Sequence, residues 1–351
     1  MLFLPLLISL SSLPTIYASP PTCKPTSFPL PQHTCSYPPE PYIVLPTAGK
    51  GLGVFARHDL PPGTIILRET PILTIHPPPF KKGTGYPMPA ISSAVRTEFS
   101  KLPPSSQTDI LHLHHHAFPG EFDKGDGWTD VLGYIFRTNA YNTGTDIGLF
   151  PRIARINHSC QPNAAYVWNE RERKRVVYAS RAIRAGEEIS DSYIPLLIPR
   201  EERKKRLERY GFQCSCEACL LRGKKGRESD ERRVEISTIF KELEAYNTTI
   251  SSSQTVNKEE EKKAIDAAKR SLRLLSLLEK EQLADYYARA YKAVAVTHAR
   301  VRDWETASVW ANKGFERRVM EDAGSAWTVE MAELTGRFIE EWKRSMGAGT
   351  V

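Results

Sequence analysis

The strongest chemical signal in the sequence is a group of closely spaced cysteines. Cys214, Cys216 and Cys219 place three thiols within six residues, which is too close for useful disulfide pairing among them. The same spacing suits one tetrahedral Zn²⁺, which binds thiolate sulfur at about 2.3 Å. A fourth ligand is needed, and Cys160 is the remaining cysteine in the region that we expect to fold. We therefore predict a closed, structural four-cysteine zinc site, against the alternative of ordinary buried or paired cysteines.

A second chemically distinctive stretch surrounds Cys160. Residues 157–163 read NHSCQPN, and by themselves they would indicate a polar turn. We interpret the stretch as part of a functional site instead, because it has two distant partners in the sequence. These are the glycines of the run KGLG at 50–53 and the three cysteines downstream. A zinc ion shared by Cys160 and the later cysteines would join this stretch to a distant part of the chain.

Short apolar runs predict the strands that must position these residues. Six such runs are rich in apolar or β-branched residues: 42–45, 52–56, 64–67, 72–75, 164–168 and 175–178. Turn signals such as Pro62-Gly63 separate the first four, a pattern that predicts a meander of short antiparallel strands. A further strand is predicted after the tight turn at Gly186. A parallel α/β architecture is therefore disfavoured, and an α+β fold is expected.

Helices are predicted between and after these strands, at 106–117, 130–142 and 199–210. The last of them starts at Pro199 and stops before Gly211, residue types typical of a helix start and of the position after a helix end.

A group of histidines ends the first predicted helix. The residues are His112, His114, His115 and His116. Only His112 and His116 would share a helical face, and no carboxylate completes a ligand set. We interpret them as a solvated helix end rather than as a metal site.

Beyond residue 222 the composition becomes charged and helix-forming, with almost no strand signal. Apolar spacing predicts a series of helices, the last at about 326–346. Small alanines such as Ala307 and Ala311 stand opposite aromatic residues such as Tyr287 and Tyr291, which resembles a tetratricopeptide-type hairpin. Because no convincing repeat period of about 34 residues is present, we expect a helical bundle with repeat-like packing.

Four motifs together resemble those of SET-domain protein methyltransferases. They cover roughly residues 42 to 220 and stand in the family's order: KGLGVFA at 50–56, RINHSCQPN at 155–163, GEEI at 186–189 with Ser192-Tyr193, and YGFQCSCEAC at 210–219. More narrowly, the chain resembles fungal SET proteins related to the SET and MYND group. Each motif alone would be weak, whereas the four in this order are highly specific.

The resemblance implies an enzyme that transfers a methyl group from S-adenosylmethionine to a lysine ε-amine of a histone or non-histone protein. It also implies a fold of short strands that contains a pseudoknot. Tyr193 is implied as the catalytic residue, against the alternative of a core tyrosine, and Tyr210 as a residue of the lysine channel. The implied cofactor-binding residues are Lys50, Gly51, Gly53, Asn139, Asn157, His158, Tyr193 and Phe212. The implied ligands of one structural Zn²⁺ are Cys160, Cys214, Cys216 and Cys219.

The same resemblance implies a domain layout. We expect a SET domain over 42–198 with a helical insert at about 77–127, and a post-SET zinc-binding segment over 199–222. A helical domain over 228–346 would then restrict access to the lysine channel. The stretch 77–127 has no cysteine, so the MYND zinc finger of that group is missing. A rival interpretation is a catalytically weak SET-fold scaffold that binds protein partners through its helical domain.

The N-terminal residues indicate a different compartment from the cysteine cluster. Residues 1–18 resemble a secretory signal peptide, although no Lys or Arg precedes Lys24. Residues 19–41 form a proline-rich arm with Cys23 and Cys35, which could pair in a secreted protein. A thiolate zinc site instead favours a reducing compartment such as the nucleus or cytoplasm, so the localisation stays open.

The overall charge says little about partners. A formal net charge of +7 and a pI near 9.0 favour acidic partners such as nucleic acid, chromatin or an anionic surface. The excess is small and spread along the chain, so it is no direct evidence of nucleic-acid or membrane binding. With 40% hydrophobic and 25% charged residues, the composition is that of a globular protein. We expect a monomer that acts on a protein substrate.

Overall fold

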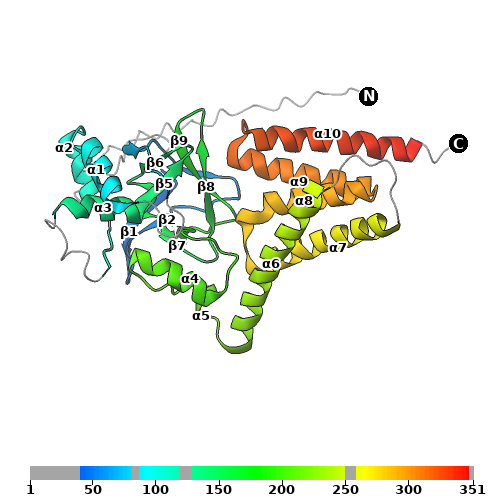
Figure 1. Ribbon diagram of the computed structural model, residues 1–351, viewed down its shortest axis with the longest axis horizontal. Helices are drawn as coiled ribbons and strands as arrows, with labels where there is room; N and C mark the ends of the chain where they lie inside the picture. The colour runs from blue at the N-terminus through cyan, green and yellow to red at the C-terminus, as the bar shows by residue number, and fades with distance from the viewer. Residues whose placement is uncertain (1–39, 81–86, 119–127, 250–257, 348–351) are drawn as a thin grey trace, which may run out of the picture. The chain divides into compact units, whose positions relative to one another are not determined.

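The computed structural model describes residues 40–80, 87–118, 128–249 and 258–347. The candidate signal peptide, the proline-rich arm up to residue 39, and with it Cys23 and Cys35, lie outside the described residues. Short strands dominate the first half of the described chain, and long helices dominate the second half (Figure 1). This arrangement confirms the predicted α+β class.

One small sheet brings the polar stretch beside the strand that leads to Tyr193. Its order is β1 (Tyr42–Thr47), β2 (Gly51–Ala56), β10 (Glu188–Asp191) and β7 (Asn157–His158). β7 runs parallel to β10, with Asn157 opposite Ser190 and His158 opposite Asp191. Segments that are far apart in the sequence therefore share one sheet.

The third and fourth strands pair with distant strands rather than with their neighbours in sequence, which corrects the predicted meander. β3 (Ile65–Glu69) pairs with β9 (Lys174–Ala179), which also pairs with β8 (Ala164–Asn169). β4 (Leu73–Ile75) pairs with β6 (Asp146–Leu149), and β6 pairs with β5 (Ala140–Thr143). Of the first four strands, only β1 and β2 pair as neighbours in sequence. The apolar pattern of a strand indicates which of its faces is buried, but it does not indicate which other strand pairs with it.

Three helices pack together against the sheet formed by β4, β6 and β5. They are α1 (Met88–Phe99), α2 (Pro104–Leu111) and α3 (Trp128–Asn139). Their shared core includes the buried residues Ile91, Val95, Ile110 and Ile135. The sequence pattern did not predict α1, because the serines in its middle interrupt the apolar spacing.

The helix predicted over 106–117 is shorter in the structure, and of the four histidines only His112, which caps it, stands at the helix end. α2 ends at Leu111, and the residues after His112 have no regular secondary structure. Hydrogen bonds connect this segment to α3. The Asn139 amide donates to the carbonyl of His114 at 2.6 Å, and Arg137 donates to the carbonyl of His116 at 2.8 Å. These are bonds to backbone carbonyls, so a search for helical side-chain spacing could not find them.

The segment before the three cysteines follows its prediction closely. α4 (Arg200–Leu207) continues as the 3-10 turn η3 (Glu208–Tyr210) and stops at Gly211, whose φ is 78°. A Cβ on Gly211 would also lie 2.5 Å from Nδ1 of His116. Gly211 is therefore required both by its left-handed backbone and by the close approach of His116.

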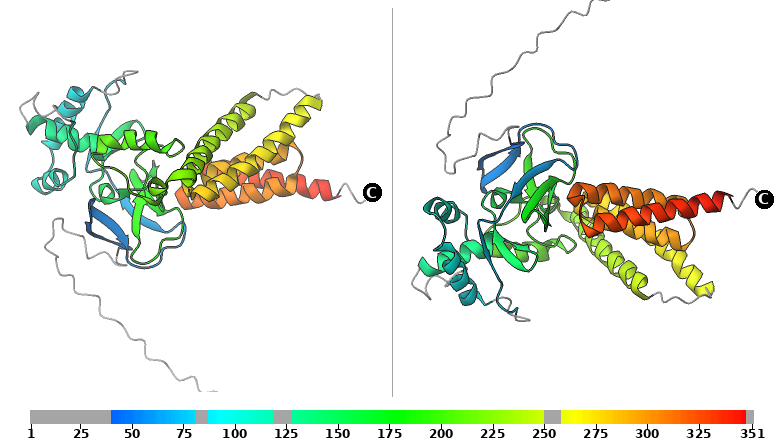
Figure 2. Two further views of the ribbon diagram at one scale, coloured as in Figure 1. Left: turned by 90° about the horizontal axis from the view of Figure 1, so that it is seen from below. Right: turned by 90° about the horizontal axis from the view of Figure 1, so that it is seen from above.

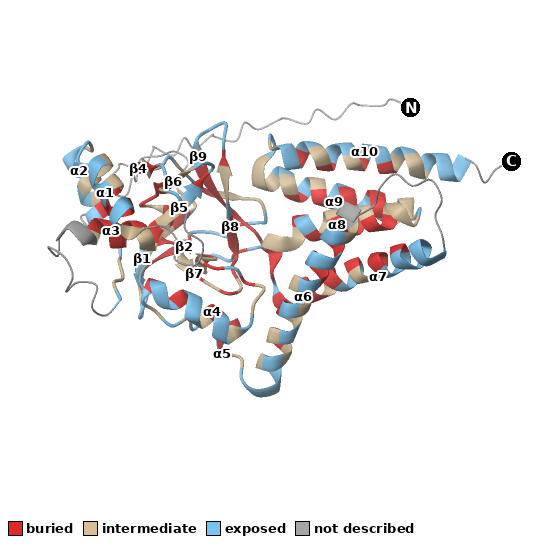
Figure 3. Ribbon diagram, in the orientation of Figure 1, coloured by how far each residue is buried: buried red, intermediate tan, exposed pale blue. Residues whose placement is uncertain are grey.

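The C-terminal half consists of long helices that pack in sequence order (Figures 1 and 2). They are α6 (Gly223–Thr249), α7 (Lys258–Glu281), α8 (Tyr287–Arg300), α9 (Trp304–Asp322) and α10 (Ala326–Gly347), with the short turn η4 (Ala284–Tyr286) before α8. The buried residues of α7 line one side of that helix and its exposed residues the other (Figure 3). The helical series begins at Gly223, somewhat before the expected 228. No helix among the described residues is long and apolar enough to cross a membrane.

A buried arginine on α6 joins the helices to the strand-rich half. Arg233 is fully buried, and its Nε donates to Glu281 at the end of α7 at 2.8 Å. Its two other nitrogens donate to the carbonyls of Leu196, at 3.1 Å, and Cys160, at 3.0 Å. Arg232 donates to the second oxygen of Glu281 at 2.7 Å. The charge of Glu281 is therefore fully matched inside the protein.

We predict that Arg233→Met destabilises the protein by about 3–5 kcal/mol, because it removes one of the two arginines that match the buried Glu281 charge and leaves the carbonyls of Leu196 and Cys160 without this donor. Urea unfolding followed by circular dichroism measures this loss. The control Arg273→Met removes an exposed partner of Glu235 and should have little effect. Equal stability of the two variants would contradict a structural role for the buried arginine.

Candidate functional site

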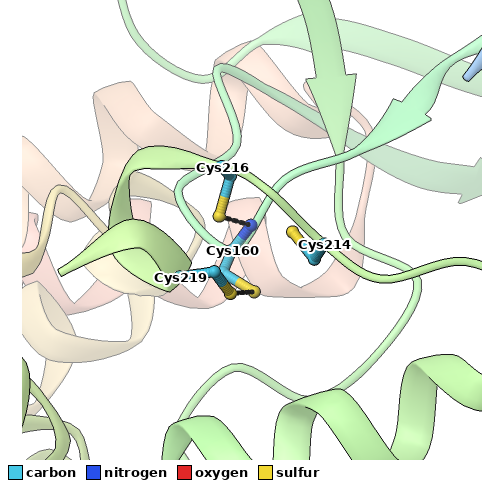
Figure 4. A group of neighbouring side chains, drawn as sticks. All are labelled: Cys160, Cys214, Cys216 and Cys219. Carbon is cyan, nitrogen blue, oxygen red and sulfur yellow. Dashed lines mark hydrogen bonds between the residues drawn. The ribbon is translucent and has the colours of Figure 1, made fainter. Parts of the chain in front are cut away.

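The four cysteines outside the N-terminal arm come together in one cluster. The Sγ atoms of Cys160, Cys214, Cys216 and Cys219 all lie within 4.8 Å of one another. Figure 4 shows that Cys160 comes from a different segment than the other three and that the sulfurs gather in one place. The Cys160 and Cys219 sulfurs are 3.6 Å apart. Since a tetrahedron with 2.3 Å metal–sulfur bonds has sulfurs about 3.8 Å apart, this donor set fits one Zn²⁺.

Hydrogen bonds among the four thiols shift their pKa values in opposite directions, lowering those of Cys216 and Cys219 and raising those of Cys160 and Cys214. The pKa of Cys216 lies well below its usual range, because hydrogen bonds from Cys160, Cys214 and Cys219 stabilise its charged form. The backbone N–H of Cys160 also donates to the Cys216 sulfur at 3.4 Å. Nearby positive charge comes from Arg203, whose pKa is raised by Cys160 and Cys219 against the effect of its burial. A metal that binds here would displace the remaining thiol protons, since it binds deprotonated sulfur.

His158 connects the cluster with Tyr193. Its Nδ1 accepts a hydrogen bond from the backbone N–H of Tyr193 at 3.1 Å, and its Nε2 lies 3.3 Å from the Cys160 sulfur. Burial lowers the pKa of His158 to about 4, so the ring is neutral at physiological pH. Because Nδ1 accepts, the proton of the neutral ring sits on Nε2 and points at the sulfur. The orientation of His158 is thereby set from both sides.

Tyr193 lies in an aromatic cluster with Tyr210 and Phe212. Its hydroxyl donates to the carbonyl of Ile156 at 2.6 Å, and the Tyr210 hydroxyl donates to the carbonyl of Tyr193 at 3.1 Å. The Tyr193 ring centroid is 5.0 Å from that of Tyr210 and 6.3 Å from that of Phe212. Burial raises the pKa of Tyr193 well above its usual value, so the hydroxyl keeps its proton.

The glycine run and the polar stretch meet at Glu188. Asn157 donates to Glu188 at 2.7 Å and to the carbonyl of Leu52 at 3.1 Å, and Lys50 forms an ion pair with Glu188 at 2.9 Å. A Cβ on Gly53 would lie 2.8 Å from the Glu188 carboxylate. Gly51 has a φ of 72° and open space where a Cβ would be. Gly53 is therefore needed for internal packing, and Gly51 leaves its backbone accessible.

Asn139 is placed differently from the other predicted cofactor residues. It lies at the end of α3, and its amide donates to the carbonyls of His114 and Ile135. These two hydrogen bonds join the end of α3 to the segment around His114 and to the preceding turn of the same helix. Its role in cofactor binding stays a prediction.

Sequence reasoning missed several polar residues near Tyr193. Asp191 is fully buried, and its Oδ2 lies 3.5 Å from the Tyr141 hydroxyl. The Arg175 guanidinium lies 4.4 Å from the centroid of the Tyr141 ring and 4.5 Å from that of Tyr166. Burial raises the pKa of Asp191, and Arg175 opposes that rise. Inward-facing charged residues within predicted strands were the available signal, because such residues need a buried partner.

A cavity of about 510 Å³ opens beside Tyr193. One side is lined by residues of β8 and β9 and by the segment 192–196. The other side is lined by Asp285 and Tyr286 of η4 and by Arg318 and Glu321 of α9. The helical half of the chain therefore contributes directly to the space around Tyr193.

The sequence is similar to those of known proteins. A family model, the SET domain, matches residues 51–194. Histone-lysine N-methyltransferase set5 of Schizosaccharomyces pombe is 31% identical over 284 residues, which cover 79% of this chain and 78% of that protein. Histone-lysine N-methyltransferase SMYD3 of Homo sapiens is 35% identical over 108 residues, which cover 30% of this chain and 25% of that protein. A solved structure of Rubisco LSMT bound to AdoMet aligns with 86% of this chain and 87% of its own at 14% identity. Its TM-score is 0.31, a likeness that adds nothing to the family assignment.

We predict that the purified protein contains one Zn²⁺ per chain and that Cys160→Ser loses most of it, because three thiolates hold zinc less tightly than a closed set of four. Elemental analysis measures the metal, and a thermal melt should show lower stability. Ser215→Ala, an exposed change between two of the ligands, is the control and should keep the zinc. Full zinc content in Cys160→Ser would exclude Cys160 as a ligand.

Proposed function

The chain belongs to the SET-domain family, and from that premise we propose that it is a protein-lysine N-methyltransferase that uses S-adenosylmethionine. The relatives that carry methyltransferase names support the reaction class. The observation that carries the proposal is the meeting of His158, Tyr193, Tyr210 and Phe212 beside the four-cysteine cluster. The substrate is a protein, either a histone or another protein with an accessible lysine.

The residues around β2 and β7 fit a cofactor that carries an amino-acid group and an adenine. S-adenosylmethionine supplies the methyl group when bound. The accessible backbone at Gly51 would allow close approach, and Asn157 and His158 would offer polar groups from β7. Lys50, which already pairs with Glu188, is exposed enough to meet a carboxylate as well. The partly buried Phe212 would provide a face for the adenine, a stacking contact of about 1–3 kcal/mol.

Tyr193 and Tyr210 would hold the lysine amine. A free lysine has a pKa of about 10.4, so the amine must become neutral before it can attack a methyl group. Burial among tyrosine rings disfavours the ammonium form, as it keeps the Tyr193 hydroxyl neutral. The Tyr193 hydroxyl, which is held at the carbonyl of Ile156, would orient the amine. Positioning then accounts for most of the rate.

Zinc would have a structural role in this site. All four ligands come from the protein, so no coordination position is left for a substrate. The bonds of His158 to Cys160 and Tyr193 would transmit the shape of the cluster to the catalytic tyrosine.

We predict that Tyr193→Phe lowers kcat about 100-fold and leaves cofactor affinity nearly unchanged, because the ring remains and only the orienting hydroxyl is lost. Methylation of a lysine-containing peptide library, followed by mass spectrometry, measures the rate, and calorimetry with S-adenosylhomocysteine measures the affinity. Tyr246→Phe on α6 is the matched control and should behave as wild type. A wild-type protein that binds no cofactor would exclude the enzyme and favour a scaffold.

We also predict that Gly53→Ala lowers cofactor affinity at least about tenfold, because the added Cβ would collide with the Thr47 hydroxyl and the Glu188 carboxylate and so displace Asn157. Gly336→Ala on α10 is the control, since a Cβ there meets open space. Calorimetry on both variants gives the comparison. Unchanged affinity in Gly53→Ala would separate the glycine run from the cofactor site.

A further inference from the structure

We propose that the buried positive charge of Arg175 favours the neutral form of the target lysine amine, and that Arg175 thereby sets the pH range in which the enzyme methylates. The inference rests on the proposed function, because it places the target lysine in the cavity beside Tyr193. It adds an electrostatic role for a residue that lies behind the cavity wall.

Arg175 is a charged residue in the interior of the strand-rich half. It belongs to β9, and only 3% of its surface is exposed. One of its terminal nitrogens donates to the backbone carbonyl of Asn142, and its Nε has no hydrogen-bond partner within the described part of the chain. Burial lowers the pKa of Arg175, but a guanidinium keeps its proton in proteins. The interior beside β9 therefore contains a positive charge.

The nearest carboxyl groups are poor counter-charges for Arg175. Asp191 on β10 is close enough to affect the pKa of Arg175, but its Oδ2 lies at the Tyr141 hydroxyl and its Oδ1 is without a partner among the described residues. Burial raises the pKa of Asp191 well above its usual range. Glu69 stands opposite Arg175 in the pairing of β3 with β9, but its carboxylate accepts two backbone N–H groups of residues 152–153. Burial raises the pKa of Glu69 to about 7.

Two tyrosine rings separate Arg175 from the cavity. Its Cζ lies 4.5 Å from the centroid of the Tyr166 ring and 4.4 Å from that of Tyr141. Tyr166 lines the cavity together with Tyr193. Burial raises the pKa of Tyr166 to about 12 and that of Tyr141 well above its usual value, so both hydroxyls stay neutral. The charge of Arg175 therefore acts on the cavity across a neutral aromatic wall.

The wall formed by η4 and α9 adds little net charge. Glu321 forms an ion pair with Arg318. Burial raises the pKa of Asp285 to about 7, and Arg317 opposes that rise. Each of these two carboxyl groups thus has an arginine beside it. Arg175 differs from them, because within the described residues it forms no ion pair.

The separation is short enough for the charge to matter. A lysine ammonium against the other face of the Tyr166 ring would lie about 9 Å from the guanidinium, twice the distance from Cζ to the ring centroid. At an effective dielectric constant of about 20, two like charges at this distance repel enough to lower the pKa of the amine by about one unit. A neutral amine is not repelled. Because the free amine has a pKa of about 10.4, such a shift raises its neutral fraction at physiological pH about tenfold.

The first test measures kcat from about pH 7 to pH 10 at saturating peptide, because kcat reports the groups that titrate in the enzyme–substrate complex. In wild type, kcat should rise with pH as the bound lysine loses its proton. Arg175→Met should move this rise about one unit to higher pH, lowering kcat about tenfold below it and leaving kcat near that of wild type above it. Arg175→Lys keeps the charge and should keep the wild-type profile.

Arg68→Met is the matched control. Arg68 is a cation on β3 of the same sheet, but 47% of its side chain is exposed, so solvent screens its charge. Its loss should leave the pH profile unchanged.

Peptide binding gives a second readout that needs no turnover. Fluorescence anisotropy at pH 7, with S-adenosylhomocysteine present, compares a peptide that contains one lysine with the same peptide that contains norleucine. Repulsion acts only on the lysine peptide. In Arg175→Met, the lysine peptide should therefore gain about tenfold in affinity relative to the norleucine peptide. A merely structural role of Arg175 would weaken both peptides alike.

The outcomes separate the two proposals. An unshifted rise of kcat in Arg175→Met, a loss of kcat that is equal at every pH, or an unchanged ratio of the two affinities overturns the electrostatic role and leaves the methyltransferase intact. If wild type neither binds S-adenosylhomocysteine nor methylates any peptide, the proposed function itself fails. Arg175→Gln, which keeps a donor for the Asn142 carbonyl, takes the place of Arg175→Met if that variant does not fold. A wild-type rise of kcat at or above the free-lysine pKa of about 10.4 would by itself exclude any such effect.

Discussion

The burial of Arg233 is the constraint on which the two halves of this protein depend. A fully buried guanidinium is tolerated only where its donors are matched, and here they meet Glu281 and the carbonyls of Leu196 and Cys160. Glu281 ends α7, Leu196 follows Tyr193, and Cys160 belongs to the four-cysteine cluster. One side chain thus links the helical region, the segment after the candidate catalytic residue and the candidate zinc ligands.

The four-cysteine cluster and the candidate catalytic tyrosine form a continuous set of contacts. The fourth cysteine comes from the loop after β7, so closing the cluster draws that loop against the segment before α5. His158 then connects the Cys160 sulfur with the backbone of Tyr193. A neutral, buried imidazole held at both nitrogens has little freedom. The geometry around Tyr193 is therefore tied to the state of the cluster.

The helical region does more than cover the strands. η4 and α9 bring carboxylates to a cavity whose opposite wall includes Tyr193, so one space is built from both halves of the chain. The cavity beside Tyr193 therefore exists only when the helical region is packed against the strands.

Patterns local in the sequence predicted much of this protein. The cysteine spacing predicted a cluster that the structure contains, Gly211 marked a real helix end, and the short apolar runs marked real strands. The four motifs indicated the SET family, to which the chain belongs. Each of these signals depends on residue type at short range, through thiolate chemistry, backbone conformation or the alternation of buried side chains.

Only the tertiary structure decided how those pieces meet. In the structure, β3 and β4 pair with distant strands instead of forming the predicted meander, and most of the histidines lie beyond the end of α2. Glu188 binds both Lys50 and Asn157. The fold also brings Asp285 to the cavity beside Tyr193. These contacts join residues that are distant in the chain. From the sequence alone, a charged residue is expected to be exposed to solvent, and only the structure shows which residues surround it. The sequence by itself therefore determined the chemistry that this protein carries, and the packing of remote segments determined where that chemistry is placed.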